Sequence, residues 1–221
     1  MERTAIVVLA GGVGTRVGAG VNKTLLSIGG VSVVARSVRT ALDASPSRVV
    51  VVVRAEDREE LSAAIQPVLG DDEIWLVDGG VERHDSEWNA LKALASAIES
   101  GEIHVVAIHD AARPLATADL YRDVVLAARA HGGAIPTVRM DHLIGADGAV
   151  VAVQTPQAFR GSDLLAAYRR ADEEGFRGTD TASCLERFTD LTIVGVPSSS
   201  TNLKVTYPED LAVAEELLLG S

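Results

Sequence analysis

Short apolar segments rich in β-branched residues, separated by helical patterns, are the feature that most constrains the fold of this chain. The continuous apolar pattern of strands buried on both faces occurs at residues 4–9, 48–53, 73–77 and 103–109. Helical patterns alternate with these strands at residues 31–43, 56–69, 86–100 and 117–131. This alternation predicts an α/β fold with a mostly parallel sheet and helices on both faces.

The pattern changes after residue 132. Residues 140–154 indicate a short hairpin that turns at Asp147-Gly148. The other predicted elements are strands at 133–138 and 191–196 and helices at 162–174, at 179–188 and from Pro208 onward. Since no repeat or linker interrupts the sequence, we expect a single domain, 1–221, with a short hairpin arm near 139–154.

The charge balance narrows the range of ligands. The chain has 31 acidic and 20 basic residues, which gives a formal net charge of −11. An acidic surface repels DNA and RNA, so nucleic acid is not an expected partner. An anionic small molecule must therefore be bound where Lys and Arg side chains converge locally.

Location is predicted from apolar runs and cysteine content. No apolar run is long enough to cross a membrane, and the first residues do not have the pattern of a secretory signal, so no membrane partner is expected. The single cysteine, Cys184, cannot form an internal disulfide and is expected to be a small buried residue. These features predict a reducing, cytoplasmic location.

A glycine-rich loop, residues 9–30, follows the first predicted strand. A P-loop needs a glycine directly before its Lys-Thr pair, where this chain has Asn22, and a dinucleotide fingerprint needs a third glycine, where it has Val17. What remains is A-G-G-x-G-x-R followed by Lys23. The N–H groups of such a loop can wrap a triphosphate while Arg16 and Lys23 neutralise the phosphate being displaced. A tight strand–helix turn with solvated cations is the alternative.

Two further polar clusters follow the third and fourth predicted strands. In G-G-V-E-R-H-D-S, Gly80 would let the backbone approach a flat ring, with Arg83 and Ser86 as polar partners; a turn with a helix cap is the alternative. In H-D-A-A-R-P, Asp110 stands where open α/β sheets bind ligands and is suited to hold Mg²⁺ against phosphate oxygens. Arg113 either donates to the ligand or anchors the loop through a buried ion pair.

Six motifs occur in one order across nearly the whole chain: A-G-G-V-G-T-R with the later Lys23, G-G-V-E-R-x-x-S, H-D-A-A-R-P, T-P-Q-A-F, T-D-T-A-S and N-L-K-V-T. Together they resemble the polyol-phosphate cytidylyltransferases, and most of all the 2-C-methyl-D-erythritol 4-phosphate cytidylyltransferase family of isoprenoid biosynthesis. The resemblance implies a Rossmann-like nucleotidyltransferase fold with glycosyltransferase-A-type topology. It also implies a reaction of CTP with a polyol phosphate that gives a CDP-alcohol and pyrophosphate and requires Mg²⁺.

The resemblance assigns roles residue by residue. Catalytic cations beside the phosphates would be Arg16, Lys23 and Lys204. Nucleotide binding would fall to Ala10, Gly11, Gly12, Gly14, Gly80, Arg83, Ser86, Asp110 and Arg113, with Asp110 also at the metal. A phosphate monoester is largely dianionic at pH 7, so its attack needs no general base. We accordingly expect His109, which ends an apolar strand, to be a packed residue.

The chain departs from the family pattern at three places. Asn22 replaces a proline, which predicts a slightly looser loop, and Thr201 replaces an aspartate. The family's projecting β-arm, which exchanges between subunits, is represented by a shorter stretch that lacks the arm's Asp-Thr pair and later arginine. Arg139 and Thr155 are the remaining candidates for acceptor binding in that region.

The short arm affects the expected partner and substrate. It predicts a more open acceptor pocket and, if the protein forms a homodimer, a smaller or altered interface. A more open pocket leaves ribitol or glycerol phosphate as alternative acceptors, with 2-C-methyl-D-erythritol 4-phosphate then handled poorly. Two different functions also fit the motifs: a sugar-phosphate nucleotidyltransferase that uses another NTP, and a non-catalytic relative that only binds nucleotide.

Overall fold

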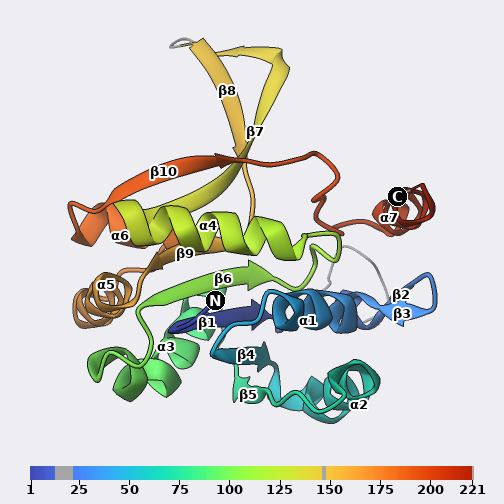
Figure 1. Cartoon of the computed structure of the whole chain (residues 1–221), viewed down its shortest axis with the longest axis horizontal. Coiled ribbons are helices and arrows are strands. Elements are labelled where there is room, and N and C mark those ends of the chain that lie inside the picture. Colours follow the sequence, from blue (N-terminus) through green and yellow to red (C-terminus); the bar gives the residue numbers. More distant parts are fainter. Residues whose placement is uncertain (13–21, 146–147, 221) are drawn as a thin grey trace.

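The structure, a computed structural model, describes residues 1–12, 22–145 and 148–220, without the side chains of 141–149. An eight-stranded sheet runs through the molecule in the order β10-β7-β9-β6-β1-β4-β5, with β8 paired to β7 (Figure 1). Helices pack on both of its faces. The predicted fold class is confirmed.

The elements alternate along the chain much as predicted. The strands are β1 (Thr4–Leu9), β2 (Ser27–Ile28), β3 (Val31–Ser32), β4 (Arg48–Val53), β5 (Trp75–Asp78), β6 (Val105–Asp110), β7 (Gly132–Gly145), β8 (Gly148–Val153), β9 (Gln157–Arg160) and β10 (Thr192–Pro197). The helices are η1 (Lys23–Leu25), α1 (Val33–Asp43), η2 (Ala55–Asp57), α2 (Arg58–Leu69), α3 (Arg83–Glu99), α4 (Ala118–His131), α5 (Gly161–Glu174), α6 (Thr181–Phe188) and α7 (Pro208–Leu219). Helix α3 begins at Arg83 rather than at the predicted residue 86.

The sheet is mixed rather than wholly parallel. Strand β1 pairs in parallel with β4 and β6, and β4 pairs in parallel with β5. Strand β9, which the sequence pattern did not predict, inserts antiparallel between β6 and β7. The parallel strands β1, β4, β5 and β6 therefore end at one edge, and the loops that follow them meet there.

Two apolar layers hold the helices onto the sheet. Because side chains alternate along a strand, the buried residues of T-A-I-V-V-L and R-V-V-V-V-V divide between the two faces. One layer packs α1, α2 and α4 against the sheet, and the other packs α3, α5 and α6. Cys184 is fully buried in the second layer, as predicted, and burial raises the pKa of its thiol to about 12.

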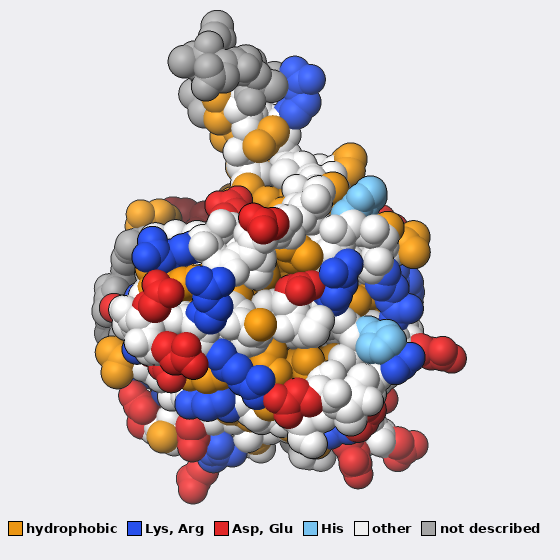
Figure 2. Space-filling model, turned by 90° about the vertical axis from the view of Figure 1, so that its left-hand side faces the viewer, with side chains coloured by type: hydrophobic (Ala, Val, Ile, Leu, Met, Phe, Trp, Pro, Cys, Tyr) orange, Lys and Arg blue, Asp and Glu red, His pale blue; other side chains and the backbone are white. Residues whose placement is uncertain are grey.

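Strands β7 and β8 form an arm, residues 137–153, that projects from the sheet (Figure 1). The hairpin lies where the sequence predicted it, near residues 139–154, but β7 is longer than the predicted strand 133–138. Its first strand is 14 residues long because it pairs with β10 and β9 in the sheet before it continues into the arm. In Figure 2 the arm stands above a body whose visible face mixes acidic and basic side chains.

The C-terminal helix α7 begins with Pro208 at its first position, as predicted, and packs against β2. In the part of the chain that the structure describes, no helix combines the length and apolar character needed to cross a membrane.

Candidate active site

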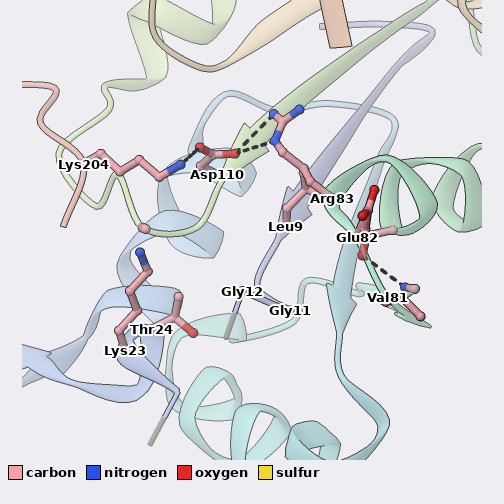
Figure 3. A pocket seen from close by; sticks show the side chains of 13 residues that line it. Leu9, Gly11, Gly12, Lys23, Thr24, Val81, Glu82, Arg83, Asp110 and Lys204 are labelled. Carbon is pink, nitrogen blue, oxygen red and sulfur yellow. Dashed lines mark hydrogen bonds and ion pairs between the residues drawn. The ribbon is translucent and has the colours of Figure 1, made fainter. Parts of the chain in front are cut away.

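A pocket with a cavity volume of about 290 Å³ opens at the edge where the parallel strands end (Figure 3). Its lining comes from segments far apart in the sequence: Leu9, Gly11, Gly12, Lys23, Thr24, Gly80, Val81, Glu82, Arg83, Ser86, Asp110, Ala112 and Lys204. The first glycine-rich segment, the loop before α3, the end of β6 and the segment before α7 thus meet at one site. This is the position at which open α/β sheets bind ligands.

Asp110, the last residue of β6, is the charged centre of the pocket. One carboxylate oxygen lies 2.6 Å from the Lys204 ammonium, and the other accepts hydrogen bonds from Arg83 at 3.3 and 3.4 Å. Burial alone would raise the pKa of Asp110, but Arg83 and Lys204 outweigh it and hold the pKa well below its usual range. Asp110 is therefore ionised at neutral pH.

Lys204 is fixed by the backbone around it. The N–H of Val205 donates to the carbonyl of Ala112 at 2.8 Å, which ties this segment to the loop after β6. Arg113 donates to the carbonyl of Asn202 at 2.7 Å. Arg113 therefore anchors the loop, which is one of its two expected roles, but it does so by a hydrogen bond to a carbonyl instead of the expected ion pair. Its side chain does not line the pocket.

Lys23 stands at the start of η1, next to a buried asparagine that fixes it. The amide of Asn22 donates to the carbonyl of Ala10 at 3.0 Å and to the carboxylate of Asp57 at 2.8 Å. Its oxygen accepts from the N–H of Thr24 at 3.1 Å and from the hydroxyl of Thr24 at 2.8 Å. Asn22 therefore joins the end of β1, η1 and η2 around the lysine.

Asp57 is itself held in place. Arg54 donates to both of its carboxylate oxygens, at 2.7 and 2.9 Å. Burial would raise the pKa of Asp57, but the hydrogen bonds from Arg54 and Asn22 lower it. Asn22 itself is firmly held, because both hydrogen-bonding groups of its side chain are occupied, and the loop that it was expected to loosen lies outside the described residues.

The two glycines before α3 are needed for packing. A Cβ on Gly80 would lie 2.2 Å from the Cβ of Asp85, and one on Gly79 would lie 3.0 Å from the Ser86 hydroxyl. That hydroxyl accepts from the N–H of Gly80 at 3.1 Å, and the carboxylate of Asp85 accepts from the N–H of Glu82 at 3.1 Å. A helix cap is present, but the N-cap is Glu82, and Asp85 takes part from the third position of the helix. The residues expected to contact the ligand also line the pocket.

The pocket unites eight of the predicted site residues: Gly11, Gly12, Lys23, Gly80, Arg83, Ser86, Asp110 and Lys204. Four others lie elsewhere, among them Arg113, as described above. Ala10 is buried, with its N–H donating to Val52, and Arg139 is exposed on the arm. Thr155 is buried beneath Asp110, whose N–H donates to its hydroxyl at 3.0 Å, so it supports the site instead of lining it. Gly14 and Arg16 lie outside the described residues.

The histidine next to Asp110 is a buried residue. His109 is fully buried, its ring nitrogens lie 3.2 Å from the Thr155 hydroxyl and the Arg113 carbonyl, and burial lowers its pKa to about 4. It is the packed residue that was expected.

No group of three or more His, Cys, Asp or Glu side chains is arranged for a metal among the residues described.

The residues that support the site are the ones that sequence reasoning missed. Asn22 stands out in the sequence only as a departure from a family pattern, and no role was predicted for Glu87, which pairs with Arg83. The spacing of four residues between Arg83 and Glu87 on one helix was a usable signal. No local signal links Asn22 to Asp57, 35 residues further along the chain.

Comparisons with known proteins show the family and agree with the fold. Residues 4–219 match the family model described as 2-C-methyl-D-erythritol 4-phosphate cytidylyltransferase. Proteins of that name from Geobacillus kaustophilus and Bacillus mycoides are 38% and 36% identical, with 96% of this chain covered and 95% and 96% of theirs.

Solved structures agree in fold. The crystal structure of 4-diphosphocytidyl-2C-methyl-D-erythritol synthase from Anaerococcus prevotii matches with a TM-score of 0.80 at 24% identity, covering 99% of this chain and 96% of that one. The 2-C-methyl-D-erythritol 4-phosphate cytidylyltransferase from Thermus thermophilus matches with a TM-score of 0.73 at 24% identity, covering 99% and 100%. The family match spans nearly the whole chain, and this chain therefore belongs to the 2-C-methyl-D-erythritol 4-phosphate cytidylyltransferase family.

Proposed function

We propose that this protein transfers a cytidylyl group from CTP to 2-C-methyl-D-erythritol 4-phosphate, giving a CDP-alcohol and pyrophosphate. The observation that carries the proposal is the convergence of Lys23, Arg83, Asp110 and Lys204 on one pocket where the parallel strands end. Relatives at 36–38% identity bear the name of this activity. That name favours methylerythritol phosphate over ribitol or glycerol phosphate as the acceptor.

The reaction needs positioning and charge neutralisation more than proton transfer. An oxygen of the acceptor phosphate attacks the α-phosphorus of CTP, and the bond from that phosphorus to the oxygen bridging to the β-phosphorus breaks, releasing pyrophosphate. The second pKa of a phosphate monoester is about 6, so the attacking oxygen is already ionised at pH 7. Lys23 and Lys204, whose ammonium groups point into the same part of the pocket in Figure 3, neutralise the charge that develops.

Mg²⁺ is the proposed cofactor, with Asp110 as its protein ligand. Mg²⁺ commonly binds through one or two carboxylates together with substrate phosphates and keeps several waters, which fits a pocket with one buried carboxylate. When bound, the ion would neutralise phosphate oxygens. Lys204, 2.6 Å from Asp110, competes for the same carboxylate, and Lys204 can turn to the phosphates instead.

We also propose a cytoplasmic location and a homodimer, each from one feature of the chain. A single cysteine, buried at position 184, suits a reducing cytoplasm. The projecting arm carries exposed valines on β8, which suits a homodimer formed through the arms.

The test is pyrophosphate release with purified protein and Mg²⁺. CTP is offered with 2-C-methyl-D-erythritol 4-phosphate, ribitol 5-phosphate or glycerol 3-phosphate, and ATP, GTP and UTP replace CTP in parallel. We expect release to be fastest with CTP and methylerythritol phosphate. Faster release with another pair would reassign the substrates, and CTP binding without release from any pair would indicate a non-catalytic relative.

A further inference from the structure

A buried carboxylate, Glu87, lies directly behind the pocket on α3. Its side chain is 1% exposed and forms an ion pair with Arg83, one helical turn earlier. The hydroxyl of Thr181 donates to one of its oxygens at 2.7 Å, and the hydroxyl of Tyr168 donates to the other. A carboxylate is costly to bury unless such partners surround it, so this arrangement needs a reason beyond packing.

Arg83 is shared between this carboxylate and the pocket. On the pocket side it donates to Asp110 at 3.3 and 3.4 Å, which is longer than the 2.6 Å between Lys204 and Asp110. On the core side it pairs with Glu87 and donates to the Thr181 hydroxyl at 3.4 Å. Burial would lower the pKa of Arg83, but Glu87 first and Asp110 second raise it, so the guanidinium stays charged.

The charges of this group balance in pairs. Asp110 faces two cations, Lys204 and Arg83, while Glu87 supplies Arg83 with a carboxylate of its own. Without Glu87, Arg83 would have Asp110 as its carboxylate partner in this group and would be drawn onto it. With Glu87 present, Asp110 remains available to Lys204 and to a bound nucleotide or cation.

We propose that Glu87 and Thr181 are positioning residues that hold Arg83 in the orientation in which it binds the nucleotide, an inference that rests on the proposed function. The T-D-T-A-S motif then has a role. Asp180 caps α6 by accepting the N–H of Ser183 at 2.9 Å, and this cap fixes Thr181, the first residue of the helix, beside the guanidinium.

The first test compares two substitutions of Thr181. Thr181→Val keeps the shape and removes the hydroxyl, whereas Thr181→Ser keeps the hydroxyl and removes the methyl group. We expect Thr181→Val to raise KM for CTP about fivefold with kcat within about twofold, and Thr181→Ser to stay within about twofold of wild type in both. The reverse order would show that Thr181 acts through packing and would overturn its positioning role.

The second test removes the charge of Glu87. Glu87→Gln should raise KM for CTP about tenfold with kcat within about threefold. Glu99→Gln on the same helix, where the glutamate forms an exposed pair with Arg169, is the matched control and should leave KM unchanged. In an Arg83→Met background, Glu87→Gln should add nothing to the KM of Arg83→Met alone. An additional increase, or an unchanged KM in folded Glu87→Gln protein, would overturn the proposal.

Folding and function are separated in these tests. Thermal unfolding of every variant identifies protein that is not folded, and the Thr181 pair decides the question if Arg83→Met does not fold. CTP affinity measured by calorimetry should change by the same factors as KM. If wild-type protein binds CTP and releases no pyrophosphate, the proposed reaction fails while the positioning role is still decided by calorimetry.

Discussion

At the scale of single residues, the lysines are concentrated at the pocket. The chain has three, of which Lys23 and Lys204 line the pocket while Lys92 is exposed on α3, its ammonium 5.5 Å from the ring of Trp88. We expect Lys23→Ala and Lys204→Ala each to lower kcat about a hundredfold or more, because both charges line the pocket in which the proposed reaction would place the phosphates. Lys92→Ala is the control. Steady-state kinetics at saturating CTP measures the effect, and weaker CTP binding with unchanged turnover would contradict the assigned role.

A second residue-scale prediction concerns Asp110. A buried carboxylate next to a polyanionic nucleotide is unfavourable unless a cation lies between them. We therefore expect Mg²⁺ to tighten CTP binding to the wild type, and Asp110→Asn to weaken that dependence on Mg²⁺. Calorimetric titrations with Mg²⁺ and with EDTA measure the ratio of the two affinities. Equal affinities for the wild type in both buffers would rule out the proposed metal role.

Stability should depend on pH through His109. The unfolded chain protonates this group near its ordinary pKa of 6.5, whereas the folded protein does so only at about 4. Between these values the unfolded state binds more protons, so the free energy of unfolding falls as the pH falls, by up to about 1.4 kcal/mol per pH unit. Burial lowers the pKa of His84 as well, and it contributes in the same direction.

The measurement is Tm between about pH 7 and about pH 4.5 for wild type and His109→Gln, the range in which the two states differ in bound protons. We expect the wild type to lose Tm across this range and the variant to lose less. The exposed His104, changed to Gln, is the matched control and should behave as wild type. An equal loss in His109→Gln would show that other groups dominate the acid response.

At the scale of elements, the junction of β1, η1 and η2 depends on one asparagine. Asn22→Ala removes the hydrogen bonds that the Asn22 amide donates to Ala10 and Asp57, and it leaves a buried carbonyl and carboxylate short of a donor. We expect the free energy of unfolding to fall by about 1–3 kcal/mol and kcat to fall about tenfold. Chemical denaturation and kinetics measure the two effects. Full activity in a destabilised Asn22→Ala protein would show that Lys23 does not depend on this junction.

The strands that are buried on both faces could be predicted from the sequence. Thr4–Leu9 and Arg48–Val53 are observed with the predicted bounds. Continuous apolar, β-branched segments of this length are typical of parallel strands that are buried on both faces. Strand β9 was missed: four residues give too little periodicity, and its antiparallel place between β6 and β7 is set by distant partners. The length of β7 was also missed, because this one strand pairs first with β10 and β9 in the sheet and then with β8 in the arm.

The candidate site divides in a similar way. Residues at a strand end or just after it, such as Asp110 and Gly11, could be placed because parallel strands end at a common edge. Residues that hold them were harder to place, because the partners of Asn22 and Glu87 at positions 57 and 181 are brought near only by the fold. The spacing of four residues between Arg83 and Glu87 was a local signal that could have been used. Thr155 was placed in the acceptor site from its motif, whereas in the structure its hydroxyl is used by the backbone of Asp110.

At the scale of the whole molecule, the arm projects from the sheet, and its exposed apolar side chains are not covered by either of the two apolar layers. Val151 and Val153, on one face of β8, are 48% and 47% exposed. Exposed valines on a projecting hairpin are unfavourable in a lone chain and are favoured where a partner covers them. We therefore predict that the protein is a dimer in solution and that the arms contribute to its interface.

Changing both arm valines to aspartate tests this prediction. We expect Val151→Asp with Val153→Asp to convert the dimer to a monomer in sedimentation experiments, because charges cannot be buried unpaired at an interface. CTP affinity should stay within about twofold of wild type, since the pocket lies on other elements, while KM for the acceptor should rise about tenfold or more if the partner's arm completes the acceptor site. Val213→Asp on α7 changes a valine of equal exposure, 48%, and should leave the dimer intact. Wild-type protein that sediments as a monomer at tens of micromolar would refute the arm interface. A monomeric double variant with unchanged acceptor KM would confine the arm to assembly and leave the acceptor site within one chain.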